Sequence, residues 1–288
     1  MASTTHANPN SYYLPAPSHW PVVGSVAVFL LMVSLVMWMN DVNGGFLVMA
    51  AGFAVLLYFL FGWFGTVIRE SESGLYNKQV DVSYRWAMSW FIFSEVMFFA
   101  AFFGALFYMR ALSVPWLTEG ATGELLWQGF KSTWPASGPG IEESFTPMGA
   151  WGIPAINTLI LLTSGLTVTW AHWGLKKNNR GQLTLGLLLT IVLGIVFLCL
   201  QVYEYVHAYK DLNLTLAAGA YGATFFMLTG FHGFHVTLGT IMLIVIFFRA
   251  LKGHFTAERH FAFEAVSWYW HFVDVVWLLL FVLVYWLV

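Results

Sequence analysis

Long apolar runs separated by short polar stretches make up most of this 288-residue chain. Each run has about 20 residues or more, which is the length that an α-helix needs to cross the hydrocarbon core of a bilayer. The runs are continuously apolar and do not alternate, so they predict helices rather than the strands of a membrane barrel. The pattern predicts an all-α membrane protein with seven transmembrane helices, over residues 18–39, 44–68, 82–110, 150–175, 183–209, 217–249 and 259–288.

Two polar segments divide the predicted helices into groups. Residues 69–81 are the one polar break long enough to act as a linker on the inner side. They separate residues 1–68, an N-terminal tail and a two-helix unit, from a five-helix bundle over residues 82–288. Inside that bundle, residues 111–149 are rich in Gly, Pro and Trp and predict a sizeable loop on the outer side.

Lysine and arginine are distributed unevenly between the two sides of the predicted helices. Three segments, 69–81, 176–182 and 250–258, with their flanking turns, hold nine of the twelve basic residues. These are Arg69, Lys78, Arg85, Lys176, Lys177, Arg180, Arg249, Lys252 and Arg259. Because cytoplasmic loops carry the excess of Lys and Arg, the N-terminus is predicted inside and the C-terminus outside. An odd number of spans, such as seven, satisfies this arrangement.

The composition narrows the class of protein further. Hydrophobic residues make up 59% of the chain and charged residues 9%, whereas soluble domains carry about 25% charged residues. A net charge of −2 without any basic cluster gives no indication of nucleic-acid binding. The single cysteine, Cys199, can form neither an internal disulfide nor a multi-thiolate metal site.

Polar side chains at membrane depth are the candidate functional residues. Glu95 lies in "FIFSEVMFF", where an ionised carboxylate is costly unless it is paired, neutralised or hydrated. The sixth predicted helix carries His232 and His235, and the seventh carries Glu264, Ser267, His271 and Asp274 at spacings of three, four and three. Gly219, Gly222, Gly230 and Gly233 predict close packing of the sixth helix against a neighbour.

Three interpretations of these polar residues stay open at this point. They can face the bundle interior and bond to one another, they can hold a metal or haem, or they can form a proton or ion path. The histidines of "HGFH" are too few for a closed zinc site, so we expect no metal bound by this chain. A path would need polar groups across the whole membrane, and the sequence does not show them.

Several motifs resemble the cytochrome c oxidase subunit III family, that is, subunit 3 of the haem–copper oxidases. They are "VIRESESG" at 67–74, "FIFSEVMFFAAFF" around Glu95, "NTLILLTSGLTVTWAH" at 157–172, "GATFFMLTGFHGFHVTLGT" at 222–240 and "HFAFEAVSWYWHFVDVVWLLLFVLVYW" at 260–286. The resemblance runs in order from "SHWPVVGS" at 18–25 to the C-terminus, and "WYWHFVDVVW" is highly specific.

The resemblance implies a non-catalytic core subunit of an aa3-type terminal oxidase, which reduces oxygen to water and pumps protons. Haem a, haem a3, CuA and CuB are then expected in the partner subunits I and II, with subunit I as the main contact and cytochrome c as the electron donor. This chain would support the stability, proton uptake and oxygen access of subunit I. His232, Glu264, His271 and Asp274 are expected to be buried and structural.

The resemblance also implies bound phospholipids, in a V-shaped cleft between the two-helix and five-helix groups. Family lipid contacts map onto Trp63, Arg69, Glu70, Glu95, His235 and Arg249. Glu95 is then expected to be a neutral carboxyl that faces Phe98, Phe99 and Phe102 and is hydrogen-bonded to His235.

Two alternative functions remain open, and the identity of the membrane is also only an expectation. A quinol oxidase subunit III shares the fold, but its members commonly lack the first two helices, which this chain keeps. A stand-alone transporter or proton channel would use Glu95, His235 and Asp274. The long 111–149 segment resembles bacterial members, so we expect a multi-pass protein of the bacterial plasma membrane, with a periplasmic C-terminus, rather than of the mitochondrial inner membrane.

Overall fold

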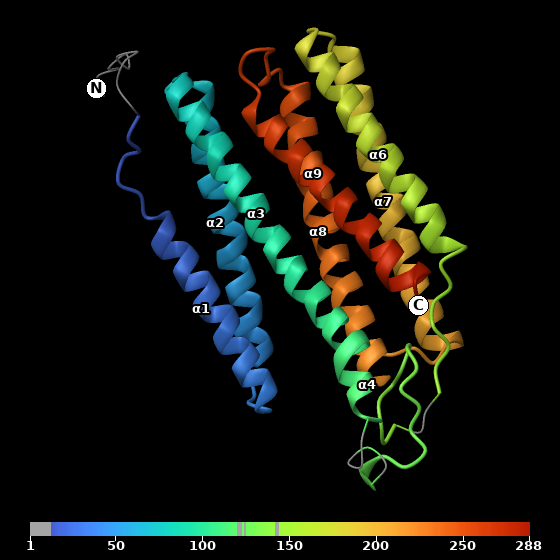
Figure 1. The fold of residues 1–288 in the computed structure, drawn as a ribbon. Helices are drawn as coiled ribbons and strands as arrows, with labels where there is room; N and C mark the ends of the chain where they lie inside the picture. Colours follow the sequence, from blue (N-terminus) through green and yellow to red (C-terminus); the bar gives the residue numbers. More distant parts are fainter. Residues whose placement is uncertain (1–12, 120–122, 124, 142–143) are drawn as a thin grey trace. The chain divides into compact units, whose positions relative to one another are not determined.

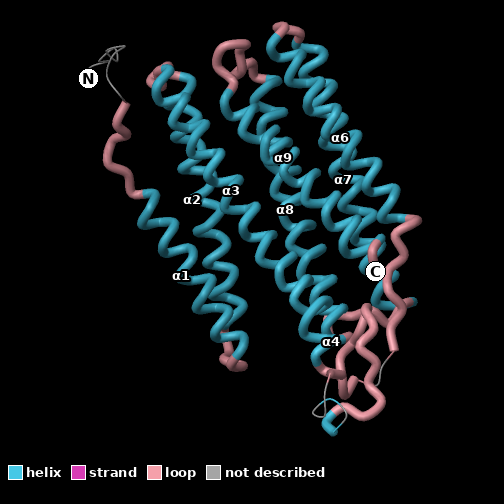
Figure 2. The backbone as a smooth tube through the Cα atoms, in the orientation of Figure 1, coloured by secondary structure: helices cyan, strands magenta, loops and turns pink. Residues whose placement is uncertain are grey.

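A computed structural model describes residues 13–119, 123, 125–141 and 144–288, and helices make up most of this part of the chain (Figures 1 and 2). Seven of its helical segments are long and apolar enough to cross a membrane. They are Trp20–Met39, Gly45–Glu72, Lys78–Trp116, Ile153–Lys176, Arg180–Asp211, Gly219–Leu251 and Phe261–Trp286. No strand occurs among the described residues. The predicted all-α class and the seven spans are confirmed.

Three of the spans make up the N-terminal part of the chain. Helix α1 covers Trp20–Met39 and α2 covers Gly45–Glu72. Helix α3 covers Lys78–Tyr108 and continues through a π-helical turn, η1 (Met109–Ser113), into the short α4 (Val114–Trp116). The predicted polar break over 69–81 contains helix at both ends, because α2 runs on to Glu72 and α3 already begins at Lys78. A helix continues past its apolar run wherever the polar residues that follow are good helix formers.

Four further spans follow in the C-terminal part. They are α6 (Ile153–Lys176), α7 (Arg180–Asp211), α8 (Gly219–Leu251) and α9 (Phe261–Leu280), and α9 ends in a π-helical turn, η2 (Phe281–Trp286). By its internal contacts the chain divides into a first unit that ends at Tyr84 and a second unit that begins at Arg85. The division falls within α3.

In the first unit, α1 and α2 pack along their length. Small residues allow the close approach: a Cβ atom added at Gly52 would lie 3.0 Å from the side chain of Leu31. Most of the large apolar side chains of these two helices, such as Phe29, Phe46 and Phe61, are exposed. Such a surface is suited to lipid rather than to water.

In the second unit, α6, α7, α8 and α9 lie alongside one another (Figure 1). Helix α9 is the most enclosed of the spans, and its Trp270 has no exposed surface. The indole lies against Gly194 of α7 and Gly239 of α8, where an added Cβ would come within 2.9 Å of the ring. Its Nε1–H donates to Ser164 Oγ of α6 at 2.9 Å. One side chain thus contacts three neighbouring helices.

The glycines that were expected to bring the sixth span close to a neighbour behave differently. A Cβ at Gly233 would have no atom of another residue within 4 Å, and one at Gly230 would lie 3.7 Å from Tyr205 Oη. Gly219, with a φ of +83°, lies against the carbonyl of Ser137 at the start of α8. A Cβ at Gly222 would lie close to the carbonyl oxygen of Thr215, which precedes the helix. The prediction was wrong for Gly230 and Gly233, and Gly239 provides the close contact further along the helix.

Helix α3 contacts α8 through large side chains, and the two backbones do not pack closely. The rings of Phe98 and Phe102 lie 5.0 and 5.1 Å from that of Phe231, and Phe99 lies 4.9 Å from His235. Aromatic pairs at these separations and tilts are favourable. The second part of α3 is therefore attached to the bundle by an aromatic layer.

The described part of the 111–149 segment packs on the ends of α7 and α8. The backbone N–H groups of Ala220 and Tyr221 donate to the carbonyls of Ser137 and Ala136, at 2.8 and 3.1 Å. These bonds satisfy donors in the first turn of α8 that have no partner within the helix. The ring of Phe145 stacks on that of Tyr221, with centroids 5.3 Å apart.

Candidate functional site

Glu95 and His235 meet in the second unit, from α3 and α8. His235 Nε2 lies 2.8 Å from Glu95 Oε2, and His235 Nδ1 lies 2.6 Å from the carbonyl oxygen of Phe231. A carbonyl only accepts, so Nδ1 carries a proton and donates it. If the ring is neutral, Nε2 is an acceptor and the carboxyl of Glu95 donates; if the ring is charged, Nε2 donates to the carboxylate. The predicted hydrogen bond between these two residues is present.

Aromatic side chains surround this pair. His235 is 6% exposed, and the side chain of Glu95 is 23% exposed. Phe98, Phe99 and Tyr269 lie with their ring centroids 5.8, 4.9 and 6.4 Å from that of the imidazole. In such surroundings a hydrogen bond between two neutral groups costs less than a separated pair of charges. The site therefore has one polar contact inside an apolar layer.

Arg249 lies in the last turn of α8, at the end of the helix that the distribution of Lys and Arg predicts to be inner. Its guanidinium Cζ lies 4.8 Å from the ring centroid of Phe255, and the residue is half-buried. A guanidinium over an aromatic face is stabilised by the cation–π interaction. This arrangement holds the charge beside the apolar part of the chain.

The other three predicted lipid contacts belong to the first unit. Trp63 of α2 is 45% exposed and packs with Phe59 and Phe64. Arg69 is exposed, and its Nη2 donates to Thr66 Oγ1 at 3.2 Å. The carboxylate of Glu70 accepts a 2.8 Å hydrogen bond from the hydroxyl of Tyr76, which follows α2.

The hydroxyl of Tyr76 is kept protonated. Burial, with hydrogen bonds to Tyr84 and Glu70, raises the pKa of Tyr76 well above its usual value. It therefore remains a donor to Glu70 at all physiological pH values, which fixes the carboxylate in place.

The polar stripe of α9 separates into two pairings. Glu264 accepts from Arg85 Nη2 of α3 at 2.5 Å. About two turns further on, His271 Nε2 lies 3.1 Å from Thr169 Oγ1 of α6, and His271 Nδ1 lies 3.5 Å from Asp274 Oδ2. Asp274 is 6% exposed, as expected, whereas the side chain of His271 is 44% exposed, so the expectation that His271 is buried was wrong.

His232 and His235 do not converge on a common ligand. His232 is 1% exposed and packs between Phe197 and Trp277, with centroid separations of 5.9 and 5.2 Å. His235 points instead to Glu95. Two imidazoles that face different neighbours cannot hold one haem iron between them.

Two polar clusters were not predicted from the sequence. Glu204 of α7 is fully buried, accepts from the hydroxyl of Tyr285 at 2.7 Å, and lies 3.4 Å from Gln201 Nε2. The second cluster contains His172, His260 and Glu264, whose possible ligand atoms all lie within 4.8 Å of one another. In the sequence, the only indication of this second cluster was that Arg85 and Glu264 carry opposite charges and lie near the predicted inner ends of their spans.

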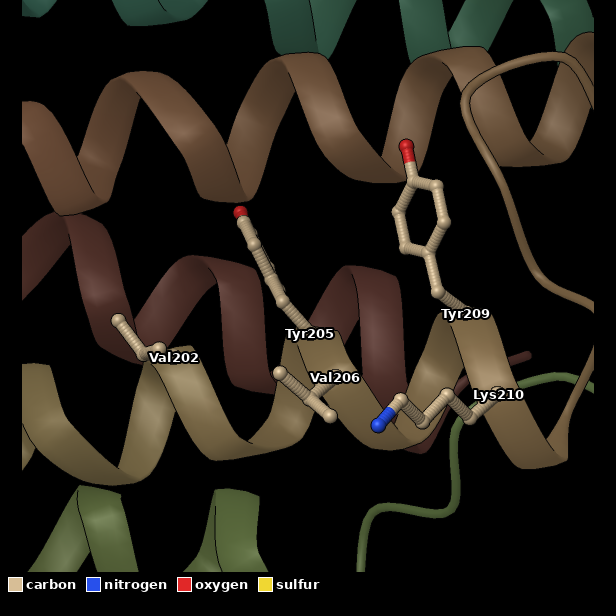
Figure 3. A pocket seen from close by; sticks show the side chains of 5 residues that line it. All are labelled: Val202, Tyr205, Val206, Tyr209 and Lys210. Carbon is tan, nitrogen blue, oxygen red and sulfur yellow. The ribbon is translucent and has the colours of Figure 1, made fainter.

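A shallow groove of about 300 Å³ lies elsewhere, along α7 (Figure 3). Val202, Tyr205, Val206, Tyr209 and Lys210 line it. None of the predicted site residues contributes to it. The groove is almost wholly apolar, and nothing in it resembles a catalytic site.

Comparison with known proteins decides between the families. The family "Cytochrome c oxidase subunit III" matches residues 10–288. The chain belongs to the cytochrome c oxidase subunit III family. It is 42% identical over 284 residues to cytochrome c oxidase subunit 3 of Drosophila melanogaster, covering 98% of each chain. It is also 42% identical over 276 residues to that of Marchantia polymorpha, covering 96% of each, and 39% identical over 287 residues to that of Hippopotamus amphibius, covering 99% of each.

Membership of the subunit III family and the seven apolar helices together make this a multi-pass membrane protein and a component of a multi-subunit oxidase. The stand-alone transporter or channel is not favoured. The buried pairs described above then stand in a subunit whose relatives are named as parts of a larger enzyme.

Proposed function

We propose that the chain is the non-catalytic subunit III of a proton-pumping cytochrome c oxidase, which passes electrons from cytochrome c to oxygen. The observation that carries the proposal is the match to subunit III over residues 10–288, which leaves only the first nine residues outside it. The chain contacts subunit I, and subunit II lies in the same complex. It supports the stability of subunit I and the uptake of protons and oxygen by it.

The redox centres of the complex, haem a, haem a3, CuA and CuB, belong to the partner subunits in this proposal. The chain has one cysteine and so cannot supply a multi-thiolate centre, and His232 and His235 face different neighbours. In this proposal the chain contributes buried polar pairs and charged helix ends next to the partner subunits, and no redox centre.

Phospholipids are the proposed ligands of this subunit. Arg249 supports this role, since its guanidinium lies beside Phe255 at a helix end, where it can pair with a lipid phosphate while its stem stays in the apolar layer. Glu95 and His235 contribute a neutral pair inside an aromatic wall that acyl chains can contact. Arg69, Glu70 and Trp63 offer the corresponding charge and apolar surface in the first unit.

The proposed location is the bacterial plasma membrane, with the N-terminus cytoplasmic and the C-terminus periplasmic. The distribution of Lys and Arg supports the orientation. The long Gly-, Pro- and Trp-rich segment over 111–149 supports the bacterial location. In a mitochondrial inner membrane the N-terminus would correspondingly face the matrix.

Spectroscopy of the complex that co-purifies with a tagged chain tests the proposal. We expect the absorption bands of haem a together with bound copper, and oxidation of reduced cytochrome c. A colourless chain that purifies alone from its own membrane would contradict the proposal.

A quinol oxidase remains the second candidate for the complex. The presence of α1 and α2 favours the cytochrome c enzyme, because quinol relatives commonly lack these helices. The choice of donor distinguishes the two: a complex that oxidises quinol, ignores reduced cytochrome c and lacks the CuA signal is the quinol enzyme.

A further inference from the structure

Three polar side chains converge at the end of the second unit where α6 stops and α9 starts. His172 lies in the last turns of α6, His260 directly precedes α9, and Glu264 lies in its first turn. Glu264 Oε1 is 3.3 Å from His260 Nε2 and 3.8 Å from His172 Nε2. The two imidazole rings have their centroids 5.3 Å apart.

Both imidazole nitrogens in this cluster are available as ligands. His172 Nε2 and His260 Nε2 are buried, and neither makes a hydrogen bond in the described part of the chain. His260 is 8% exposed, and its Nδ1 lies 3.0 Å from the carbonyl oxygen of Thr256, to which it donates. That bond leaves the lone pair on Nε2, directed toward Glu264. Metal-binding histidines are typically oriented by such a bond from their other nitrogen.

The carboxylate of Glu264 has a suitable arrangement too. Arg85 Nη2 binds Oε2 at 2.5 Å, which leaves Oε1 to face the two imidazoles. The guanidinium occupies Oε2, so that Glu264 offers one oxygen rather than two. Its position in the first turn of α9 also places the negative charge at the positive end of the helix dipole.

The separations fit a tetrahedral cation. Zinc binds imidazole nitrogen and carboxylate oxygen at about 2.0–2.2 Å, so that two ligand atoms of a tetrahedron lie about 3.3–3.6 Å apart. The two carboxylate–imidazole separations, 3.3 and 3.8 Å, are close to that value, and the two imidazole nitrogens lie within 4.8 Å of one another. Two histidines and one carboxylate leave the fourth position to water, as in open zinc sites.

We propose that His172, His260 and Glu264 bind one divalent transition-metal ion of the zinc type. The site joins the end of α6 to the start of α9, and through Arg85 it also engages α3. It is a redox-inactive site and goes beyond the proposed function, and it departs from the expectation that this chain binds no metal.

The test uses the whole purified oxidase, freed of loosely bound metal by chelation and then dialysed against zinc alone. Bound zinc is counted by mass spectrometry, and its ligands are read from X-ray absorption at the zinc edge, where haem iron and copper do not contribute. We expect His172→Gln and His260→Gln each to bind one zinc fewer per complex than the parent.

His207→Gln is the matched control. His207 also faces a carboxylate, Asp211, at 2.7 Å, but without a second histidine in the described part of the chain. We expect this variant to bind as many zinc ions as the parent. All variants are compared only if their haem content and oxygen uptake equal those of the parent.

A cysteine variant gives a positive signal and guards against a misfolded glutamine variant. In His172→Cys the zinc count should return to that of the parent, with a new zinc–sulfur distance of about 2.3 Å in the absorption spectrum. Equal zinc counts in the parent and in both glutamine variants would mean adventitious binding only and would overturn the proposal. So would a cysteine variant that keeps the parent count without any zinc–sulfur distance.

Discussion

The tautomer of His235 follows from its two neighbours. The 2.6 Å contact to the Phe231 carbonyl requires a proton on Nδ1, and the 2.8 Å contact to Glu95 then requires a proton from the carboxyl or a charged pair. The surrounding phenylalanine rings favour the uncharged form. We therefore expect Glu95 to be the hydrogen-bond donor, a role that other side chains can also fill.

This reasoning predicts the effect of Glu95→Gln. The amide is nearly isosteric, and its NH₂ group can donate to Nε2 as the carboxyl does. We expect most oxygen uptake and most of the protons pumped per electron to be retained in reconstituted vesicles. If the variant transferred electrons at the parent rate but pumped no protons, the carboxyl would be an obligatory proton carrier.

Glu95→Lys is the contrasting substitution at the same position. It places a cation against the aromatic wall and removes the donor to His235. A buried charge without a partner is costly, so we expect faster loss of activity during turnover and weaker retention of this subunit in the complex. Parent-like stability of the lysine variant would show that the side chain lies in a hydrated space.

The two arginines proposed to hold lipid phosphates can be tested together. In the Arg69→Ala, Arg249→Ala double variant we expect less phospholipid after purification, with little change in the initial rate of electron transfer. Lysine at both positions should restore the lipid only in part, because it keeps the charge but loses the planar fork. Phosphorus analysis of the purified complex measures the effect.

Arg180→Ala is the control for that experiment. Arg180 is an exposed arginine at the start of α7, at the same end of the second unit, and has no proposed lipid contact. It should leave the phospholipid content unchanged. A double variant with as much phospholipid as the parent would refute the assignment of Arg69 and Arg249.

At the scale of the helices, the sequence shows where the glycines of a helix lie but does not show which neighbouring residue each one contacts. Gly233 and Gly239 lie on the same helix, in equally apolar surroundings in the sequence. Only Gly239 faces a ring, that of Trp270, and the residue responsible lies on another helix. Periodicity describes one helix at a time, so it cannot identify such a contact.

The difference gives a paired prediction. In Gly239→Ala the new methyl group would lie 2.9 Å from Trp270, so we expect a destabilisation of about 1–3 kcal/mol through overpacking. In Gly233→Ala nothing lies within 4 Å, and the higher helix propensity of alanine should leave stability equal or slightly improved. Thermal inactivation of the complex measures both. Equal midpoints for the two variants would contradict the role given to Gly239.

For the candidate sites too, the sequence predicts some features of individual helices but not the contacts between helices that are distant in the sequence. The pairing of Glu95 with His235 could be predicted, because a carboxyl in an apolar run needs a partner and a family resemblance supplied one. The cluster of His172, His260 and Glu264 could not. His172 lies almost 90 residues before the other two, and only the folded bundle brings the end of α6 beside the start of α9.

For the whole molecule, the number of spans was accessible from the sequence alone. Apolar length determines each span, and the uneven distribution of Lys and Arg determines the expected orientation. The helix ends were less accessible, since α2 and α3 continue into polar residues. The hydrogen bonds of a helix do not end where the hydrocarbon ends.

The orientation is itself testable. A reporter fused after Val288 should read as external, and one fused after Lys177 should read as internal. The physical reason is that Lys176 and Lys177 belong to the basic side, which is retained in the compartment where the chain is made. Reversed readings at either position would contradict the seven-span orientation.

The two polar pairs of α3 have a consequence for how this helix is seated. Arg85 and Glu95 are ten residues apart, which places them about 15 Å apart along the helix and about 80° apart around it. Each meets a partner on a different helix, Glu264 of α9 and His235 of α8. A slip of one residue moves every side chain by about 1.5 Å and 100°, and it would break both pairs at once. The phenylalanine contacts between α3 and α8 are compatible with several registers. The two polar pairs are compatible with only one, and they therefore determine the register of α3.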